Sequence, residues 1–185
     1  MKNVRWWVMV GAVSWAACGG PGAGTTGTPA PAAAGGLTQK PYASLAQVMR
    51  ALPFPSANII FDAQSNDPGA PAKEGATDGS ATSRFSSIYK GWPLVEQSAL
   101  ALSETANLML IPGRLCENGK PVPLDREDFR KGIEGLVEAG KAAYAAAQSK
   151  SQDKVVEVTD KVTEACANCH MVYRDKPEGK DRCIP

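Results

Sequence analysis

Residues 151–174 read SQDKVVEVTDKVTEACANCHMVYR and contain the single histidine of the chain. Val155, Val158 and Val162 recur at intervals of three and four residues, which is the spacing of one face of an α-helix. Ser151 precedes them and is of a residue type that commonly caps a helix N-terminus. The stretch therefore predicts a long helix that starts near residue 151.

The second half of this stretch holds Cys166-Ala167-Asn168-Cys169-His170, a C-x-x-C-H motif that is the attachment pattern of a c-type haem. Each thiol adds to one vinyl group of the porphyrin, and the adjacent imidazole binds the iron. In a helix, Cys166, Cys169 and His170 are three and four residues apart, so their side chains project from one face. We therefore expect one covalent haem held by Cys166 and Cys169, with His170 as an iron ligand.

Two other chemistries use cysteines at this spacing. A thioredoxin-like redox pair follows a strand and opens a helix, whereas here helix-forming residues run into the motif from upstream. A zinc site needs a fourth ligand, which Cys116 or Cys183 would have to supply. The motif spacing therefore favours haem, and a zinc site remains an alternative.

A first helix is predicted from about residue 44 by apolar residues spaced by four and three. Pro53 and Pro55 interrupt it, because a prolyl ring removes an amide donor and clashes with the preceding turn. Ser56 then caps a continuation of the helix. The polar segment that follows, residues 66–83, is predicted to be a mobile loop.

Two further helices are predicted in the middle of the chain. Pro93 fits the first turn of one, and Asp125 fits the N-cap of the other. In the latter helix Gly140, Ala143 and Ala147 are small, which either lets a helix approach closely or leaves room for a bulky cofactor. With no strand pattern and mostly short connections, the chain predicts an all-α antiparallel four-helix bundle that carries the haem on its C-terminal helix.

Tyr173 and Arg174 stand three and four positions after His170. A haem motif followed by an aromatic and a basic residue at these positions, near the C-terminus of a helical bundle, resembles the class II c-type cytochromes, the cytochrome c-prime family. The resemblance is specific over residues 150–175 and only architectural elsewhere. It implies that His170 is the proximal iron ligand and that Arg174 lies on the proximal side of the porphyrin. The family often has a basic residue on the first helix that meets a haem propionate, a part that Arg50 could take.

The occupant of the sixth iron position decides the mechanism. Met171 adjoins the proximal ligand and cannot reach the opposite face. Because the first helix supplies the distal residue in the family it resembles, Met49 is the leading candidate ligand, with Met109 behind it; the alternative is that Met49 only packs in the core. A thioether ligand would give low-spin iron and favour its reduced state. Without it, a distal pocket lined by Leu45 and Leu52 would admit small gases such as NO and CO.

Residues 1–17 have the features of an export signal, with Lys2 and Arg5 before an uncharged run too short to span a bilayer. Small residues then precede Cys18, which resembles a lipoprotein cleavage box in which Cys18 carries the lipid. Ordinary cleavage near Ala17 is the alternative. Either event predicts an exported, periplasmic protein.

Residues 18–39 are mostly Gly, Pro, Ala and Thr, a composition that stays flexible and suits a tether after a lipid anchor. Residues 40–185 are long enough for one domain with a core. The chain has 20 basic and 19 acidic residues, and the basic count falls to 18 without Lys2 and Arg5. This balance gives no electrostatic reason to expect a nucleic-acid partner.

With Cys18 assigned to lipid and two cysteines to haem, Cys116 and Cys183 remain. In an oxidising compartment we expect them to form a disulfide that joins the C-terminal tail to the loop between the second and third helices. Such a bond would stabilise the fold by about 4 kcal/mol in the chain-entropy model. Two unrelated thiols are the alternative.

These features predict an electron carrier rather than an enzyme: a membrane-tethered monohaem cytochrome that passes one electron between redox partner proteins. A single histidine leaves no base for a hydrolytic triad, and no phosphate-binding glycine motif occurs. A five-coordinate haem protein that binds NO or CO is the first alternative. A haem-free lipoprotein that uses its cysteines for zinc or disulfides is the second. Bundles of this kind often form homodimers, but no exposed seam can be assigned from the sequence.

Overall fold

The computed structural model describes residues 39–71, 80–177 and 182–183, all within one compact unit, Thr38–Pro185. The predicted export signal, the lipid site at Cys18 and the tether up to residue 38 lie outside the described residues. The helices are α1 (Leu45–Ala51), α2 (Pro53–Asp62), α3 (Ala81–Arg84), α4 (Ser86–Tyr89), α5 (Gly91–Met109), α6 (Glu127–Gln148) and α7 (Gln152–Tyr173). The described residues contain no strand, so the all-α prediction is confirmed for this part of the chain.

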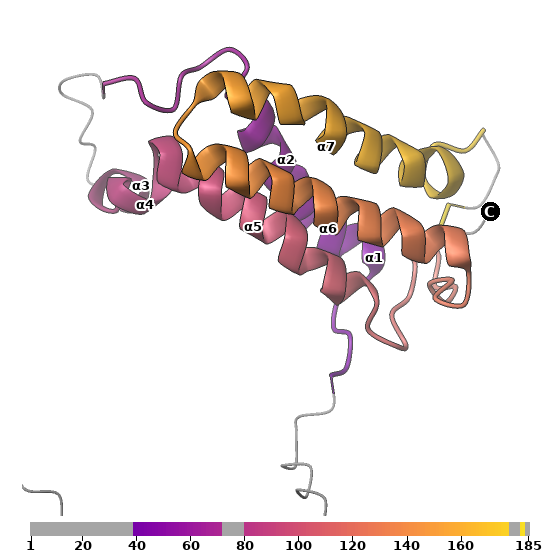
Figure 1. Cartoon of the computed structure of the whole chain (residues 1–185). Helices are drawn as coiled ribbons and strands as arrows, with labels where there is room; N and C mark the ends of the chain where they lie inside the picture. The colour runs from indigo at the N-terminus through magenta and orange to yellow at the C-terminus, as the bar shows by residue number, and fades with distance from the viewer. Residues whose placement is uncertain (1–38, 72–79, 178–181, 184–185) are drawn as a thin grey trace, which may run out of the picture. The chain divides into compact units, whose positions relative to one another are not determined.

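The three long helices form the frame of the unit. Helix α6 packs against both α5 and α7, and Figure 1 shows each of the three running antiparallel to the next. Helix α2 packs against α5 and α7, and α1 packs against α2 and α5. Residues of α1 and of the C-terminal end of α7, which carries the C-x-x-C-H motif, line one pocket and so belong to the same end of the unit. Of the helices in the described ranges, none is long and apolar enough to cross a membrane.

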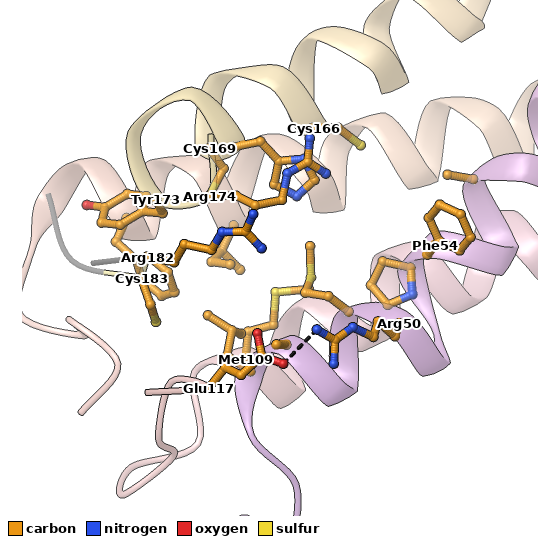
Figure 2. A pocket seen from close by; sticks show the side chains of 18 of the residues that line it. Arg50, Phe54, Met109, Glu117, Cys166, Cys169, Tyr173, Arg174, Arg182 and Cys183 are labelled. Carbon is orange, nitrogen blue, oxygen red and sulfur yellow. Dashed lines mark hydrogen bonds and ion pairs between the residues drawn. The ribbon is translucent and has the colours of Figure 1, made fainter. Parts of the chain in front are cut away.

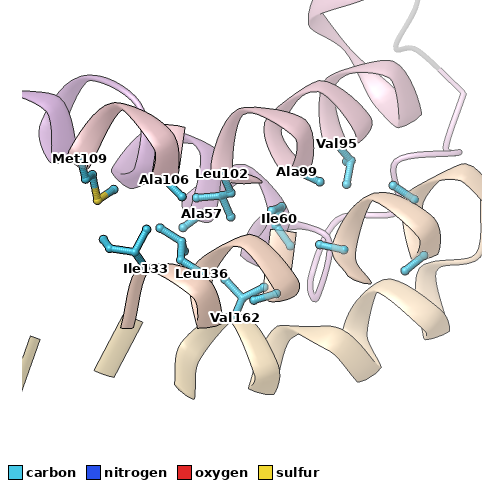
Figure 3. Close-up of a cluster of buried hydrophobic side chains, with 14 of the residues drawn as sticks. Ala57, Ile60, Val95, Ala99, Leu102, Ala106, Met109, Ile133, Leu136 and Val162 are labelled. Atoms are coloured by element: carbon cyan, nitrogen blue, oxygen red, sulfur yellow. The ribbon is translucent and has the colours of Figure 1, made fainter. Parts of the chain in front are cut away.

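The core is apolar because the helices turn their periodic apolar faces inward. Figure 3 shows side chains of α2, α5, α6 and α7 meeting there, among them Ile60, Leu102, Leu136 and Val162. The largest fully buried side chains are Phe129, Ile60, Leu102, Met109, Val155 and Val162. Burying each such side chain contributes about 1.5–3 kcal/mol relative to leaving it exposed.

The small residues of α6 serve close packing against α5. A Cβ atom at Gly140 would lie 2.5 Å from Ser103 Oγ, 2.8 Å from Ser103 N and 3.0 Å from Ala99 O. Ala143 and Ala147 are both fully buried. Of the two alternatives left open by the sequence, the structure therefore favours close helix approach over space for a cofactor at these positions.

The starts of two helices differ from the predictions. Helix α2 begins at Pro53, whose ring is tolerated in a first helical turn, and Ser56 is buried inside the helix, so the predicted Ser56 cap is wrong. Helix α6 begins at Glu127 with Arg126 as its N-cap residue, so the Asp125 cap is also wrong.

Other helix starts agree with the predictions. The Ser151 hydroxyl accepts a hydrogen bond from Lys154 N at the start of α7, and Pro93 lies in the first turn of α5. Ser44 caps α1 together with Gln47, each accepting a bond from the backbone N–H of the other. In the segment predicted as a loop, residues 66–83, the structure contains the start of α3, and residues 72–79 lie outside the described residues.

Buried Arg114 holds the end of α5 against the start of α1. Its side chain donates to Leu108 O at 3.0 Å and to Ala43 O at 2.5 Å, and the residue is only 4% exposed. A cation beside the last carbonyls of a helix interacts favourably with the helix dipole. Leu45 N also donates to Leu115 O, at 2.9 Å. These bonds fix the start of α1 against the end of α5 and the loop that follows it.

Candidate functional site

A pocket of about 720 Å³ lies between the C-terminal end of α7 and helices α1 and α2 (Figure 2). Its volume is in the range of about 300–1,000 Å³ that is typical of small-molecule and cofactor sites. Most of its wall is apolar, contributed by Leu45, Ala46, Met49, Pro53, Phe54, Ala57, Phe61, Met109, Phe129 and Ile133. The pocket can therefore hold a large apolar group beside α7.

Cys166, Cys169 and His170 all line this pocket. They occupy the last two turns of α7, and each is half-buried. Both thiols are free, because neither cysteine takes part in a disulfide. The three side chains that the motif spacing predicts on one helix face thus meet the same cavity.

Helix α6 leaves space for Cys169. A Cβ atom at Gly132 would lie 3.3 Å from Cys169 Cβ and 3.5 Å from its Sγ. Contacts of 3.0–3.4 Å are tight for a real Cβ, so the glycine lets α7 carry this cysteine close to α6. Gly132 was not identified from the sequence, where a glycine within a helical pattern was the available signal.

Burial controls the protonation of the motif. Burial raises the pKa of the Cys166 thiol, an effect that Arg174 opposes, and it raises the pKa of Cys169 to about 11, with Cys166 and Asp128 adding to the effect. Burial also lowers the pKa of His170, as does Arg174. At neutral pH the site therefore presents two thiols and a neutral imidazole, which is the form of histidine that binds metals.

The raised thiol pKa values separate this site from a redox-active cysteine pair. Exchange of thiols and disulfides proceeds through the thiolate, and reactive pairs have lowered pKa values at helix N-termini or beside cations. Cys166 and Cys169 instead lie near the C-terminal end of α7 and are held as thiols by burial.

The wall opposite α7 contains two thioethers. Met49 of α1 is partly buried and Met109 at the end of α5 is 2% exposed, and both line the pocket. Leu45 also lines it, whereas Leu52 is 38% exposed and does not, so the predicted distal role of Leu52 is wrong. Leu52 lies at the break between α1 and α2, where the backbone leaves the helical conformation. Met171 is 62% exposed.

A polar network anchors the end of α7 to the start of α6. The Tyr173 hydroxyl donates to Asp128 Oδ1 at 2.6 Å, and Arg126 Nε donates to that hydroxyl at 3.1 Å and to Asp128 Oδ1 at 3.0 Å. These hydrogen bonds, from Arg126 first and Tyr173 second, hold the pKa of Asp128 well below its usual value. The rings of Tyr173 and Phe129 pack edge to face at 5.2 Å. Tyr173 was identified from the motif pattern, but its partners Arg126 and Asp128 were not.

Cys116 and Cys183 are joined in a disulfide, with Cα atoms 5.8 Å apart. Cys183 N also donates to Tyr173 O at 2.5 Å, which ties the C-terminal tail to the end of α7. Since these two sulfurs bind each other, neither is free to be the fourth ligand of a zinc ion at the motif. In the described ranges, no three His, Cys, Asp or Glu side chains converge as a metal site would require.

Three arginines line the pocket: Arg50, Arg174 and Arg182. Arg50 forms an ion pair with Glu117 at 2.7 Å, and Arg174, just after the end of α7, pairs with Asp175 at 2.6 Å. Arg182 was not singled out from the sequence.

The chain matches no protein-family model, and no curated protein or solved structure is significantly similar to it. The resemblance to class II cytochromes therefore rests on the motif around His170 and on the helical arrangement. The chemistry available to the site is that of its own residues: two thiols, one neutral imidazole and an apolar cavity of cofactor size.

Proposed function

We propose that the protein is an exported monohaem c-type cytochrome, built as a four-helix bundle, that transfers single electrons. The observation that carries the proposal is the convergence of Cys166, Cys169 and His170 on one apolar pocket of about 720 Å³. The cysteine spacing fits the two vinyl groups of one porphyrin, and the adjacent histidine provides a nitrogen ligand for its iron. A haem held here would supply a reversible one-electron couple of iron.

The residues of the chain hold and tune this group. The Cys166 and Cys169 thiols each add across one vinyl double bond, so that sulfur bonds to one carbon and the thiol proton goes to the other, with no external oxidant. His170 is kept neutral by burial and is therefore able to bind iron as the proximal ligand. The apolar wall, which includes Phe129 and Ile133, excludes water from the ring.

The sixth iron position is the second part of the proposal. A thioether ligand from the opposite wall would make the iron six-coordinate and low-spin and would favour its reduced state. Met49 remains the first candidate, and Met109 joins it because its side chain lines the same pocket. Export and a lipid anchor at Cys18 complete the proposal, and they place electron transfer at a membrane surface.

The decisive experiment is the mass of the denatured protein after export with a competent haem-attachment system. We expect the chain to carry one covalent haem, to lose it in Cys166→Ser/Cys169→Ser and to retain it in Cys116→Ser/Cys183→Ser, the matched control pair. A wild-type chain with no added haem, or one with stoichiometric zinc instead, would contradict the proposal.

Spectra of the same protein test the axial ligand. We expect low-spin iron that carbon monoxide does not bind, and conversion to high-spin, gas-binding iron in either Met49→Ala or Met109→Ala. If the wild-type iron is high-spin and binds carbon monoxide, the gas-binding hypothesis is favoured over electron transfer.

A further inference from the structure

The C-terminal tail returns to the mouth of the pocket and is held there by three contacts. Cys183 is bonded to Cys116, and its backbone N–H donates to Tyr173 O at 2.5 Å. Asn118 Nδ2 donates to Arg182 O at 3.3 Å. The backbone at Arg182 and Cys183 is therefore held relative to α7 and to the loop after α5.

The Arg182 side chain lines the pocket and, among the described residues, forms no ion pair, although Asp175 is near enough for Arg182 to help lower the pKa of its carboxyl group. Figure 2 shows the guanidinium groups of Arg182 and Arg174 directed into the cavity between α7 and α1. Arg50 and Arg174 are neutralised by Glu117 and Asp175, as described above. Within the described part of the chain, no carboxylate lies within 4 Å of Arg182 to form an ion pair.

The pocket wall is therefore apolar in its depth and positively charged at its mouth. Arg50 pairs with Glu117 and Arg174 pairs with Asp175, so Arg182 supplies the positive charge that these two ion pairs leave at the pocket. A guanidinium presents a planar fork of N–H groups that matches the geometry of a carboxylate. The wall is complementary to a flat apolar molecule with carboxylates at one edge, which is the shape of haem with its two propionates.

We propose that Arg182 binds a propionate of the haem and that the Cys116–Cys183 disulfide holds it in position. The inference rests on the proposed haem binding and adds a residue that lies outside the attachment motif. It assigns the disulfide a role at the site in addition to stability, because the bond fixes the residue next to Arg182. To bind a propionate, Arg50 would have to break its ion pair with Glu117, and Arg174 its ion pair with Asp175.

The test compares Arg182→Gln with Arg182→Lys and with Arg130→Gln, an exposed arginine of α6 outside the pocket. Each holoprotein is assayed for haem content, reduction potential and the propionate bending band in its resonance Raman spectrum. We expect Arg182→Gln to lower the potential, because removing a nearby cation favours the more positive ferric state, and to shift the propionate band. Arg182→Lys should retain most of the potential, and Arg130→Gln should match the wild type.

A second comparison tests the role of the disulfide. Cys116→Ser/Cys183→Ser should lower the potential in the same direction, and adding Arg182→Gln to it should have a smaller effect than in the wild type, because both changes remove one interaction. If Arg182→Gln and Arg130→Gln give the same potential and the same Raman band, the inference is wrong although the cytochrome proposal stands. If the wild-type chain carries no haem, both fail together.

Discussion

The two halves of α7 have different surroundings, although the helix is continuous. In its first half Val155 and Val162 are fully buried against the other long helices. In its second half Cys166 and His170 are only half-buried and face the pocket. The first half is stabilised by close packing, whereas the second half borders the pocket and packs against fewer side chains of this chain.

The second half of α7 is stabilised by links to other parts of the chain. A disulfide closes the tail onto the loop after α5, and the Tyr173 hydrogen bonds join the end of α7 to the start of α6. Covalent and polar links around its rim therefore hold the walls of the pocket in place, while the packed half supplies the apolar core.

The largest expected effect on stability comes from removing the Cys116–Cys183 disulfide beside the pocket. Cys116→Ser/Cys183→Ser should lower the free energy of unfolding by up to about 4 kcal/mol, because the bond spans 67 positions and restricts the unfolded chain. Urea unfolding followed by circular dichroism measures the change. The wild type under reducing conditions is the control and should lose a similar amount of unfolding free energy. If the oxidised wild type, the reduced wild type and the double variant are equally stable, the disulfide does not stabilise the fold.

A medium effect is expected in the packed half. Gly140→Ala should destabilise the fold by about 1–3 kcal/mol, because the new Cβ meets backbone atoms of α5 at 2.8 and 3.0 Å. Gly135→Ala on the same helix has nothing within 4 Å and should instead stabilise it by up to about 1 kcal/mol through helix propensity. Thermal unfolding of both variants measures the contrast, and a Gly140→Ala protein as stable as Gly135→Ala would mean that α5 and α6 are not tightly packed.

The smallest effect concerns acid stability at the rim. The folded-state pKa of Asp128 is lowered, so its carboxylate stabilises the fold above its usual pKa, and this contribution is lost as the pH falls through the lowered value. Tyr173→Phe removes one cause of the lowering. Its stability deficit relative to the wild type should therefore be greatest near neutral pH and should shrink on acidification.

Tyr144→Phe is the matched control for this measurement, because the Tyr144 hydroxyl accepts a hydrogen bond from neutral Gln148 on α6. Urea unfolding at a series of pH values should show no such trend for it. A deficit in Tyr173→Phe that is constant with pH would exclude the link to Asp128.

The long helices could be predicted from the sequence because apolar residues recur along each of them at helical spacing. It failed where tertiary contacts determine the local structure. Asp128 is bonded to Tyr173, 45 positions away, and α6 starts at Glu127 rather than after an Asp125 cap. The short helices α3 and α4 have four residues each, too few to show a period.

The site was predicted to the extent that it is local. The motif spacing placed Cys166, Cys169 and His170 on one face, and the count of remaining cysteines paired Cys116 with Cys183, the same two that the structure joins. The pocket itself depends on long-range placement. Met109 and Gly132 reach the site from α5 and α6, and no local pattern distinguishes them from core residues. Arg182 had a usable signal, since it adjoins a cysteine already expected to be bonded.

The disulfide has a consequence for how the protein matures. If Cys166 and Cys169 attach haem as proposed, Cys116 and Cys183 have to be oxidised while the two motif cysteines stay reduced until they react with the vinyl carbons. Four free thiols can form two disulfides in three different ways, and in each of these ways Cys166 and Cys169 are oxidised. If the proposed haem attachment takes place in an oxidising compartment, an oxidase that acts on Cys166 or Cys169 too early would yield a chain that can no longer bind haem covalently.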